Sequence, residues 1–205
     1  MKFQDKNLVG FTTELASKAA VPGGGGASAL VGAVGVSLGN MVGALTVGKR
    51  KYADVEEDIK VLMEQAEGLR VKLLDLIEAD AACFAPLAKA YGIPKEDPNR
   101  DAIMEDALKT ACSVPMDIVR TVCEAISLME DFAKKGSALA VSDAGCGAVC
   151  CKAALQGASL NVFINTKSMK DRETAEALEK EAQDLLDKFC PIADEIFDIV
   201  FQKMK

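Results

Sequence analysis

A run of 21 residues without a single charge, 27–47, constrains the fold of this chain more than any other segment. It holds thirteen apolar residues, four glycines and four polar residues, and its length would suffice to cross a membrane. Its centre, however, is built from small residues rather than leucines, and Gly35, Gly39 and Gly43 recur at every fourth position. We therefore expect a buried helix of a water-soluble protein, with a neighbouring backbone against the glycines and a second subunit covering part of the helix.

Most of the remaining chain has the apolar period of a helix, and no segment alternates with the period of a strand. Between Tyr52 and Tyr91 the apolar residues recur at steps of three and four, which predicts one long helix. The other predicted helices are Lys2–Ala20, Asn99–Cys112, Ser113–Lys135, Ser142–Asn165 and Met169–Met204. At 205 residues, the sequence predicts an all-α fold, a single-domain bundle of long helices covering residues 1–205.

Composition excludes several classes of function. The net charge of −7 argues against broad nucleic-acid binding, and the absence of histidine removes histidine triads and histidine metal sites. The seven cysteines include no CxxC pair, and the first residues do not read as a cleavable leader, so we expect a cytoplasmic protein with reduced, packed thiols. Acid–base chemistry must then depend on Asp, Glu, Lys, Cys or Tyr side chains.

Pro22 is followed by four glycines, and Gly23, Gly24 and Gly25 are candidate ligand-binding residues. Glycines just before a helix can expose backbone donors at the positive end of the helix dipole, although a flexible connector explains the same run equally well. Near the other end of the uncharged segment, residues 43–50 match G-x4-G-K but place Arg50 where a nucleotide-binding loop needs Ser or Thr. We reject that loop and retain Lys49 as a docking point for an anion, with helix capping by cations as the alternative.

Asp80 is the single charge in the apolar seam of the long helix 52–91. A buried carboxylate must find a cation or take up a proton, and either outcome suits a general acid or base in a chain without histidine. A structural ion pair, or a register that carries Asp80 into solvent, is the alternative. We favour the catalytic interpretation.

The helix 142–165 carries three further candidates. Asp143 and Asn161 are five helical turns apart, so they share a face but are separated by about 27 Å. They could serve an elongated ligand or two sites across a dimer. Asn165 lies one turn beyond Asn161 in an apolar stretch, where buried amides need partners. For Asp143, pairing with the helix dipole is an adequate structural explanation.

Six strings, in this order and spacing, resemble the formiminotetrahydrofolate cyclodeaminase / methenyltetrahydrofolate cyclohydrolase family: PGGGGASAL, LTVGKRKY, EADAACF, ACSVP, SDAGCGA and NVFIN. The resemblance extends over almost the whole chain. It departs from the family pattern at the glycine run, where a fourth glycine stands in place of an expected serine and Ser28 follows two positions on. The family is all-helical and dimeric, so the resemblance implies a cyclodeaminase-like bundle, a homodimer and a reduced folate substrate.

The resemblance implies one of two reactions at the one-carbon bridge of tetrahydrofolate, without a metal or another cofactor. One is ring closure of formiminotetrahydrofolate with loss of ammonia, and the other is hydrolysis of 5,10-methenyltetrahydrofolate to the 10-formyl form. Asp80 would transfer the proton, with Asp143 as second candidate, and Lys49 would bind the acidic tail or polarise the adduct. The expected substrate-binding residues are Gly23, Gly24, Gly25, Thr46, Asn161 and Asn165. Two other classes stay open: a non-catalytic helical oligomerisation or partner-binding protein, and a membrane-anchored helical protein.

Overall fold

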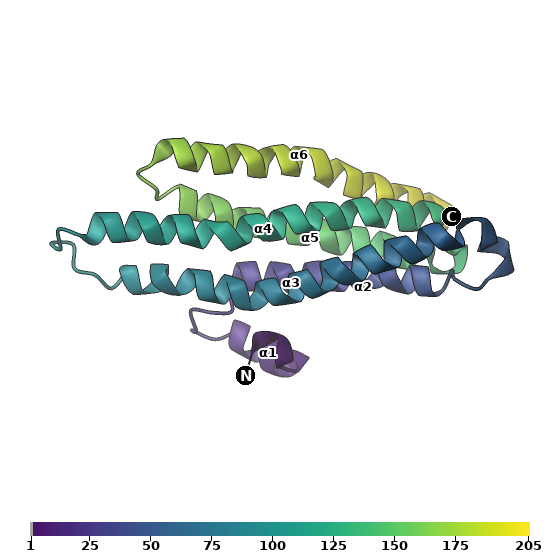
Figure 1. The fold of residues 1–205 in the computed structure, drawn as a ribbon, viewed down its shortest axis with the longest axis horizontal. Helices are drawn as coiled ribbons and strands as arrows, with labels where there is room; N and C mark the ends of the chain where they lie inside the picture. Colours follow the sequence, from purple (N-terminus) through teal and green to yellow (C-terminus); the bar gives the residue numbers. More distant parts are fainter. Residues whose placement is uncertain (1) are drawn as a thin grey trace.

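The structure, a computed structural model, describes residues 2–205, and within them every regular element is a helix. This confirms the all-α fold (Figure 1). Three short 3-10 helices cover Phe3–Asp5, Arg50–Val55 and Ala138–Ala140. The α-helices are α1 (Leu8–Leu15), α2 (Gly24–Ala44), α3 (Glu56–Ala90), α4 (Arg100–Lys135), α5 (Val141–Thr166) and α6 (Arg172–Lys203).

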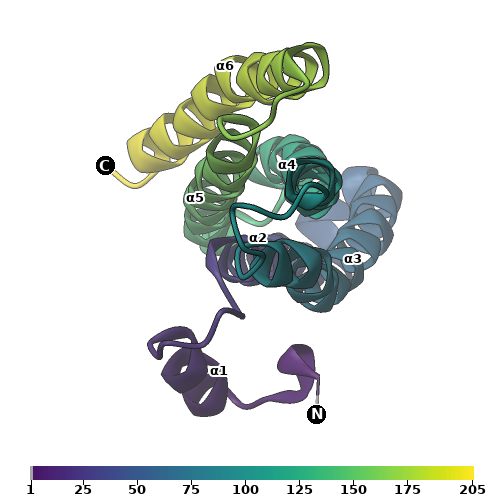
Figure 2. The ribbon, with the colours of Figure 1, turned by 90° about the vertical axis from the view of Figure 1, so that its left-hand side faces the viewer.

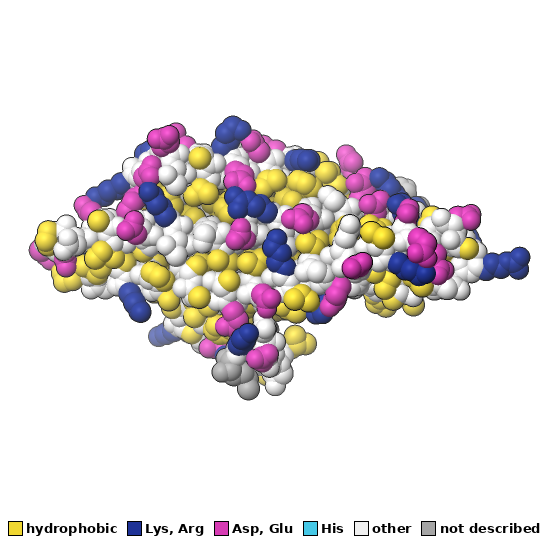
Figure 3. All heavy atoms as spheres, viewed as in Figure 1, with side chains coloured by type: hydrophobic (Ala, Val, Ile, Leu, Met, Phe, Trp, Pro, Cys, Tyr) yellow, Lys and Arg dark blue, Asp and Glu magenta, His cyan; other side chains and the backbone are white. Residues whose placement is uncertain are grey.

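The five long helices lie nearly parallel to one axis of an elongated bundle (Figure 1). In the end-on view, α2 and α5 form one side, α3 and α4 the other, and α6 lies across α4 and α5 (Figure 2). The short helix α1 lies below α2 (Figure 2), and its buried Phe11 belongs to the hydrophobic core of the bundle. Lysines, arginines and acidic residues alternate over the face formed by α3, α4 and α6 (Figure 3). That face is the solvated side of the protein, as helices with one charged stripe require.

Helix α2 packs against α3, α4 and α5, and its glycines set the spacing to them. A Cβ atom at Gly35 would lie 2.9 Å from the Gly147 carbonyl oxygen, and one at Gly147 would lie 2.8 Å from the Gly35 carbonyl oxygen. At Gly39 a Cβ would lie 2.2 Å from the terminal methyl group of Met129. The glycine ridge therefore does admit a neighbouring backbone, that of α5, as the sequence predicts.

Two segments of the described chain, Gly24–Ala44 and Ala138–Thr166, are long and apolar enough to cross a membrane by length and composition. Half of each apolar window is buried inside the protein. Core helices of water-soluble proteins pass the same test, and the outer sides of α2 and α5 account for the exposed half.

Helix α3 supplies the longest side of the core. Its apolar seam, from Ile59 through Leu73 and Ile77 to Leu87, is buried as predicted, and Asp80 is buried within it. The seam contacts buried side chains of α2 and α4, among them Val36, Val122 and Phe132. Asp80 therefore does not reach solvent through a shift of register.

The structure corrects four boundaries drawn from the sequence. The predicted helices 99–112 and 113–135 are one helix, α4, with the buried Pro115 inside it. The segment 2–20 is not one helix, because the chain is extended at Lys6 and Asn7 caps a separate α1. Gly24 to Gly26 are not a connector but the first turn of α2. Helix α5 begins at Val141, one residue before the predicted start at Ser142.

Candidate active site

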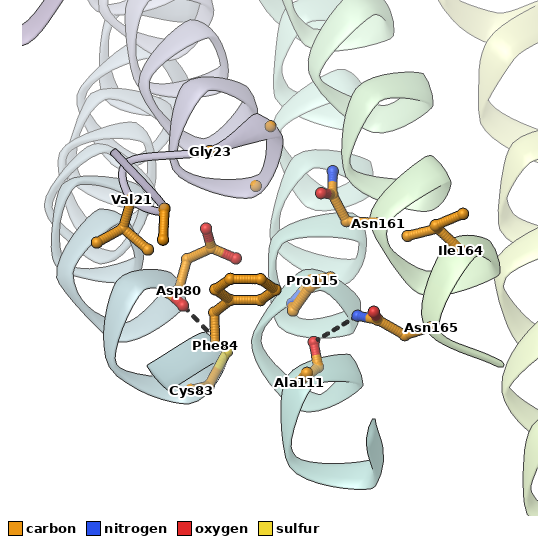
Figure 4. A pocket seen from close by; sticks show the side chains of 13 residues that line it. Val21, Gly23, Asp80, Cys83, Phe84, Ala111, Pro115, Asn161, Ile164 and Asn165 are labelled. Atoms are coloured by element: carbon orange, nitrogen blue, oxygen red, sulfur yellow. Dashed lines mark hydrogen bonds between the residues drawn. The ribbon is translucent and has the colours of Figure 1, made fainter. Parts of the chain in front are cut away.

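A pocket of about 200 Å³ opens at the end of the bundle where α2 begins. It is enclosed by the segment before α2, the first turn of α2, and side chains of α3, α4 and α5 (Figure 4). Its lining residues are Ala20, Val21, Gly23, Gly24, Gly25, Asp80, Cys83, Phe84, Ala111, Pro115, Asn161, Ile164 and Asn165. Six of the nine predicted site residues thus lie around one cavity.

Asp80 is the only charged side chain among these lining residues. Its Oδ2 accepts a hydrogen bond of 2.8 Å from the backbone N–H of Gly26, in the first turn of α2. Burial raises the pKa of the Asp80 carboxyl, and the Gly26 hydrogen bond offsets part of that effect. A carboxyl whose two protonation states are brought closer in free energy is suited to proton transfer.

The glycine run determines the position of the Asp80 carboxylate. A Cβ atom at Gly25 would lie 2.1 Å from Asp80 Oδ1 and 2.5 Å from Asp80 Cγ, closer than non-bonded atoms can approach. Only glycine at this position lets the carboxylate rest against the start of α2. The N–H groups in the first turn of α2 have no acceptor within the helix. They form the positive end of the helix dipole, which favours the charged form of Asp80.

The two asparagines of α5 complete the opposite wall of the pocket (Figure 4). Asn161 lies against Gly24, where a Cβ atom would be 3.1 Å from Nδ2, and its Nδ2 donates to the Gly157 carbonyl oxygen at 2.8 Å. Asn165 is buried and donates to the Ala111 carbonyl oxygen of α4 at 3.2 Å. These bonds leave the side-chain oxygen of each amide free to accept a bond from a ligand.

The other three predicted residues lie at the far end of the bundle. Thr46 and Lys49 follow the C-terminus of α2, which is about 31 Å from its first turn, and Asp143 is in the first turn of α5. Lys49 Nζ donates to Ser137 Oγ at 3.1 Å, and Thr46 Oγ1 accepts from the Ser137 N–H at 2.7 Å. Within one chain these residues do not reach the Asp80 pocket.

Seven of the thirteen lining residues were missed by the sequence reasoning, although a signal was present for two of them. Cys83 and Phe84 follow Asp80 by three and four positions, which places them on the same side of α3. The Phe84 ring lies between Asp80 and Pro115 (Figure 4). Burial raises the pKa of Cys83 to about 11, so this thiol is a neutral wall of the pocket rather than a nucleophile.

No group of three or more Cys, Asp or Glu side chains within residues 2–205 is placed to hold a metal ion. The pocket therefore offers one carboxyl, two amides, backbone donors and apolar surface. These groups can bind a ligand that has both polar and apolar parts, and Asp80 can exchange a proton with it.

Comparison with known proteins gives one consistent family. The family model described as Formiminotransferase-cyclodeaminase matches residues 7–184. The chain is 42% identical, over 95% of both chains, to methenyltetrahydrofolate cyclohydrolase of Methylorubrum extorquens. It is 32% identical over 171 residues to formimidoyltransferase-cyclodeaminase of Mus musculus, of which it spans 32%.

The fold agrees with a solved structure. The crystal structure of formiminotetrahydrofolate cyclodeaminase from Thermotoga maritima superposes with a TM-score of 0.84. The alignment covers 98% of this chain and 97% of that one, at 30% identity.

Proposed function

Because this chain belongs to the formiminotransferase-cyclodeaminase family, we propose that it is an enzyme of one-carbon folate metabolism acting on the bridge between N5 and N10 of tetrahydrofolate. The first candidate reaction is hydrolysis of 5,10-methenyltetrahydrofolate to 10-formyltetrahydrofolate. It is supported by the 42% identity to a methenyltetrahydrofolate cyclohydrolase over nearly the full length of both proteins.

The observation that carries the proposal is a lone carboxylate in a pocket whose lining contains no cation. The methenyl bridge is a cationic amidinium, so Asp80 provides the opposite charge beside the reacting carbon. A buried anion attracts such a cation more strongly than an exposed one, because water no longer screens the pair. Burial raises the pKa of Asp80, which makes its carboxylate a better proton acceptor than an exposed aspartate.

In the hydrolysis, the Asp80 carboxylate removes a proton from a water molecule whose oxygen attacks the bridge carbon. The tetrahedral adduct is neutral at both nitrogens. Protonated Asp80 then delivers that proton to N5 as the bond between N5 and the carbon breaks. The second proton of the water leaves from the hydroxyl group as the formyl C=O on N10 forms, so one water is consumed and one proton is released.

The second candidate is the cyclodeaminase reaction, supported by the superposition on formiminotetrahydrofolate cyclodeaminase. Here N10 attacks the carbon of the protonated N5-formimino group, an amidinium cation, and Asp80 takes the N10 proton. The same carboxyl returns it to the amine of the adduct, which leaves as ammonia and yields the methenyl bridge. Both reactions use one proton-transfer group, and neither changes the oxidation state of the carbon.

The remaining pocket groups would bind and orient the folate. The Phe84 ring and Pro115 form the apolar surface on which a pteridine can pack. Asn161 and Asn165 face it from α5 with free amide oxygens that can accept from the pteridine N–H groups. The N–H groups of Gly24 and Gly25, at the start of α2, can donate to an oxygen that gains negative charge in the adduct.

The direct test follows methenyl absorbance with purified protein, once with methenyltetrahydrofolate and once with formiminotetrahydrofolate. Loss of absorbance supports the cyclohydrolase, and gain of absorbance supports the cyclodeaminase. The Asp80→Asn variant should lose about 10²–10⁴-fold in kcat. The matched control is Asp75→Asn, an exposed residue of the same helix, which should keep the wild-type rate. An Asp80→Asn protein that folds and turns over normally contradicts the assignment.

We further propose that the enzyme acts in the cytoplasm as a homodimer and without a resident metal or redox cofactor. The chemistry supports the last point, because both reactions need only proton transfer. Activity should therefore be unchanged after dialysis against a chelator. Recovery of the protein from the soluble fraction without detergent, and a dimer mass in solution, test the other two.

A further inference from the structure

The Asp80 pocket is too small to enclose a whole reduced folate. Its volume is about 200 Å³, whereas sites that enclose a drug-sized ligand measure roughly 300–1,000 Å³. Under the proposed function, on which this inference rests, the pteridine and the one-carbon bridge occupy the pocket beside Asp80. The p-aminobenzoyl group and the glutamate tail are attached beyond the bridge, so they extend out of the pocket. The tail carries carboxylates, and the lining of the pocket holds no cation for them.

The rim of the pocket is formed by the lining residues that are exposed to solvent. These are Ala20, Gly24 and Ile164, whereas the other ten are buried or half-buried. The segment before α2, which contains Val21, and the end of α5, which contains Ile164, lie on opposite sides of the pocket (Figure 4). A tail that leaves the pocket therefore passes between these two segments.

A lysine lies just outside the rim on each side. Lys18 precedes Ala20 by two residues, so their Cα atoms are no more than about 7 Å apart. Lys167 follows Ile164 by three residues, and its backbone N–H donates to the Phe163 carbonyl oxygen at 3.1 Å, which continues the turn of α5. Residues three apart on a helix share a side, so Lys167 extends the side on which Ile164 meets the pocket. We call Lys18 and Lys167 the rim lysines; both are exposed.

The ammonium groups of the rim lysines are available to a ligand, because within residues 2–205 neither takes part in a hydrogen bond or a salt bridge. The acidic residues nearest to them in the sequence have other partners. Glu14, four positions before the first rim lysine, pairs with Lys6. Asp171, four positions after the second, accepts from Lys109 Nζ at 2.7 Å, and this contact lowers the pKa of Asp171. Neither acid competes with a ligand for the rim lysines.

Two other cations at this end of the bundle have acidic partners within the chain. Lys170 Nζ lies 2.5 Å from Asp101 Oδ2. The Arg172 guanidinium donates to the Thr166 carbonyl oxygen at 2.9 Å and to Glu179 Oε1 at 3.4 Å. A tail carboxylate would have to displace a protein acceptor at either of these residues, whereas it displaces none at the rim lysines.

We propose that Lys18 and Lys167 bind the carboxylates of the glutamate tail, one from each side of the rim, and so make the site select folates that carry glutamate. The rim lysines thus take the role that the sequence suggests for Lys49, which lies at the far end of α2. The flexible stem of lysine lets each ammonium group follow a mobile tail. The tail keeps its charge during the reaction, so these contacts stabilise the bound substrate and the transition state equally, lowering KM without changing kcat.

The first experiment measures binding, which needs no turnover. Calorimetry gives the Kd of 5-formyltetrahydrofolate and of the matching tetrahydropteroyl amide, which lacks glutamate. The Lys18→Ala/Lys167→Ala protein should bind the folate about 4–25-fold more weakly than the wild type, because one exposed ion pair contributes at most about fivefold. It should bind the amide with the wild-type Kd. The weakening should shrink at high salt, which screens exposed charges.

Two control proteins separate charge from structure. Lys18→Arg/Lys167→Arg keeps both charges and should bind the folate within about twofold of the wild type. Lys188→Ala removes an exposed lysine about 24 Å along α6 from the pocket end of that helix and should change neither Kd. Equal folate binding by the double alanine variant and the wild type overturns the proposal. Equal weakening for the folate and the amide also overturns it, because such a loss does not depend on glutamate and reflects the structural role of a cation at the end of α5.

Turnover of 5,10-methenyltetrahydrofolate distinguishes a failure of this proposal from a failure of the proposed reaction. The double alanine variant should raise KM by a similar factor and keep the wild-type kcat, whereas Asp80→Asn should lower kcat. Turnover with an unchanged KM in the double variant refutes the tail site and leaves the reaction standing. Glutamate-dependent binding through the rim lysines without turnover refutes the reaction and leaves the tail site standing. A wild-type protein that binds neither ligand overturns both.

Discussion

Substituting Gly25 by alanine tests the contact that positions Asp80. The added Cβ would lie 2.1 Å from Asp80 Oδ1, so the carboxylate must retreat by roughly 1 Å to reach an ordinary carbon–oxygen contact. Misplacing a reacting group by that distance costs about 10²-fold in rate. Overpacking costs about 1–3 kcal/mol of stability, while alanine in a helix gains at most about 1 kcal/mol over glycine. We therefore expect Gly25→Ala to fold with slightly lower stability and to lose about two orders of magnitude in kcat.

The assay combines methenyl turnover with urea unfolding, and Gly68→Ala is the matched control. Gly68 is an interior position of α3 where an added Cβ would meet no atom within 4 Å. Alanine there should raise the free energy of unfolding by about 0.8–1.0 kcal/mol and leave kcat unchanged. If Gly25→Ala turns over at the wild-type rate, Asp80 does not act from the position described.

Three further predictions concern stability and thiol reactivity. Burial raises the pKa of Asp80, so the folded protein binds its proton more tightly than the unfolded chain, and stability falls as pH rises from about 4 to the folded pKa. In urea unfolding, the free energy of unfolding of Asp80→Asn should therefore equal that of the wild type at pH 3 and exceed it at pH 7. The difference at pH 7 should be about 1.4 kcal/mol for each pH unit that separates the folded and unfolded pKa values of Asp80. Equal free energies of unfolding at pH 7 would refute this. Gly35→Ala places a Cβ 2.9 Å from the Gly147 carbonyl oxygen and should cost about 1–3 kcal/mol, seen as a lower Tm. In a thiol titration of the native protein Cys146 should react first, because it is exposed while burial raises the pKa of Cys112, Cys123 and Cys151 to about 12. Rapid reaction of these three before denaturation would contradict the packing.

The helices and the buried position of Asp80 can be predicted from the sequence because both depend on the spacing of residues within a single helix. The period of the segment 52–91 places Asp80 among apolar neighbours on α3, and five turns between Asp143 and Asn161 fix their separation. These inferences need only the geometry of one helix. They identify the carboxylate, but not what surrounds it.

The predictions that are wrong depend on contacts between helices. Glycine is a poor helix former, so the sequence places residues 24–26 before a helix, yet the approach of Asp80 makes glycine necessary inside the first turn. Pro115 has the pattern of a helix start, but the surrounding packing holds one continuous helix through it. The sequence alone could not show that Lys49 lies far from Asp80, because the distance between them depends on the direction of α2 within the bundle.

Seven of the 21 residues of α2 are glycine, and each is about 1 kcal/mol less favourable in a helix than alanine. Together this deficit, about 7 kcal/mol, is comparable with the whole net stability of a typical domain. In isolation this segment would be a coil, and it forms a helix only when α3, α4 and α5 already surround it. The amide that holds the acid in place, at Gly26, therefore exists only in the finished protein. A nascent or partly melted chain has no functioning acid, and the enzyme becomes active only when its folding is complete.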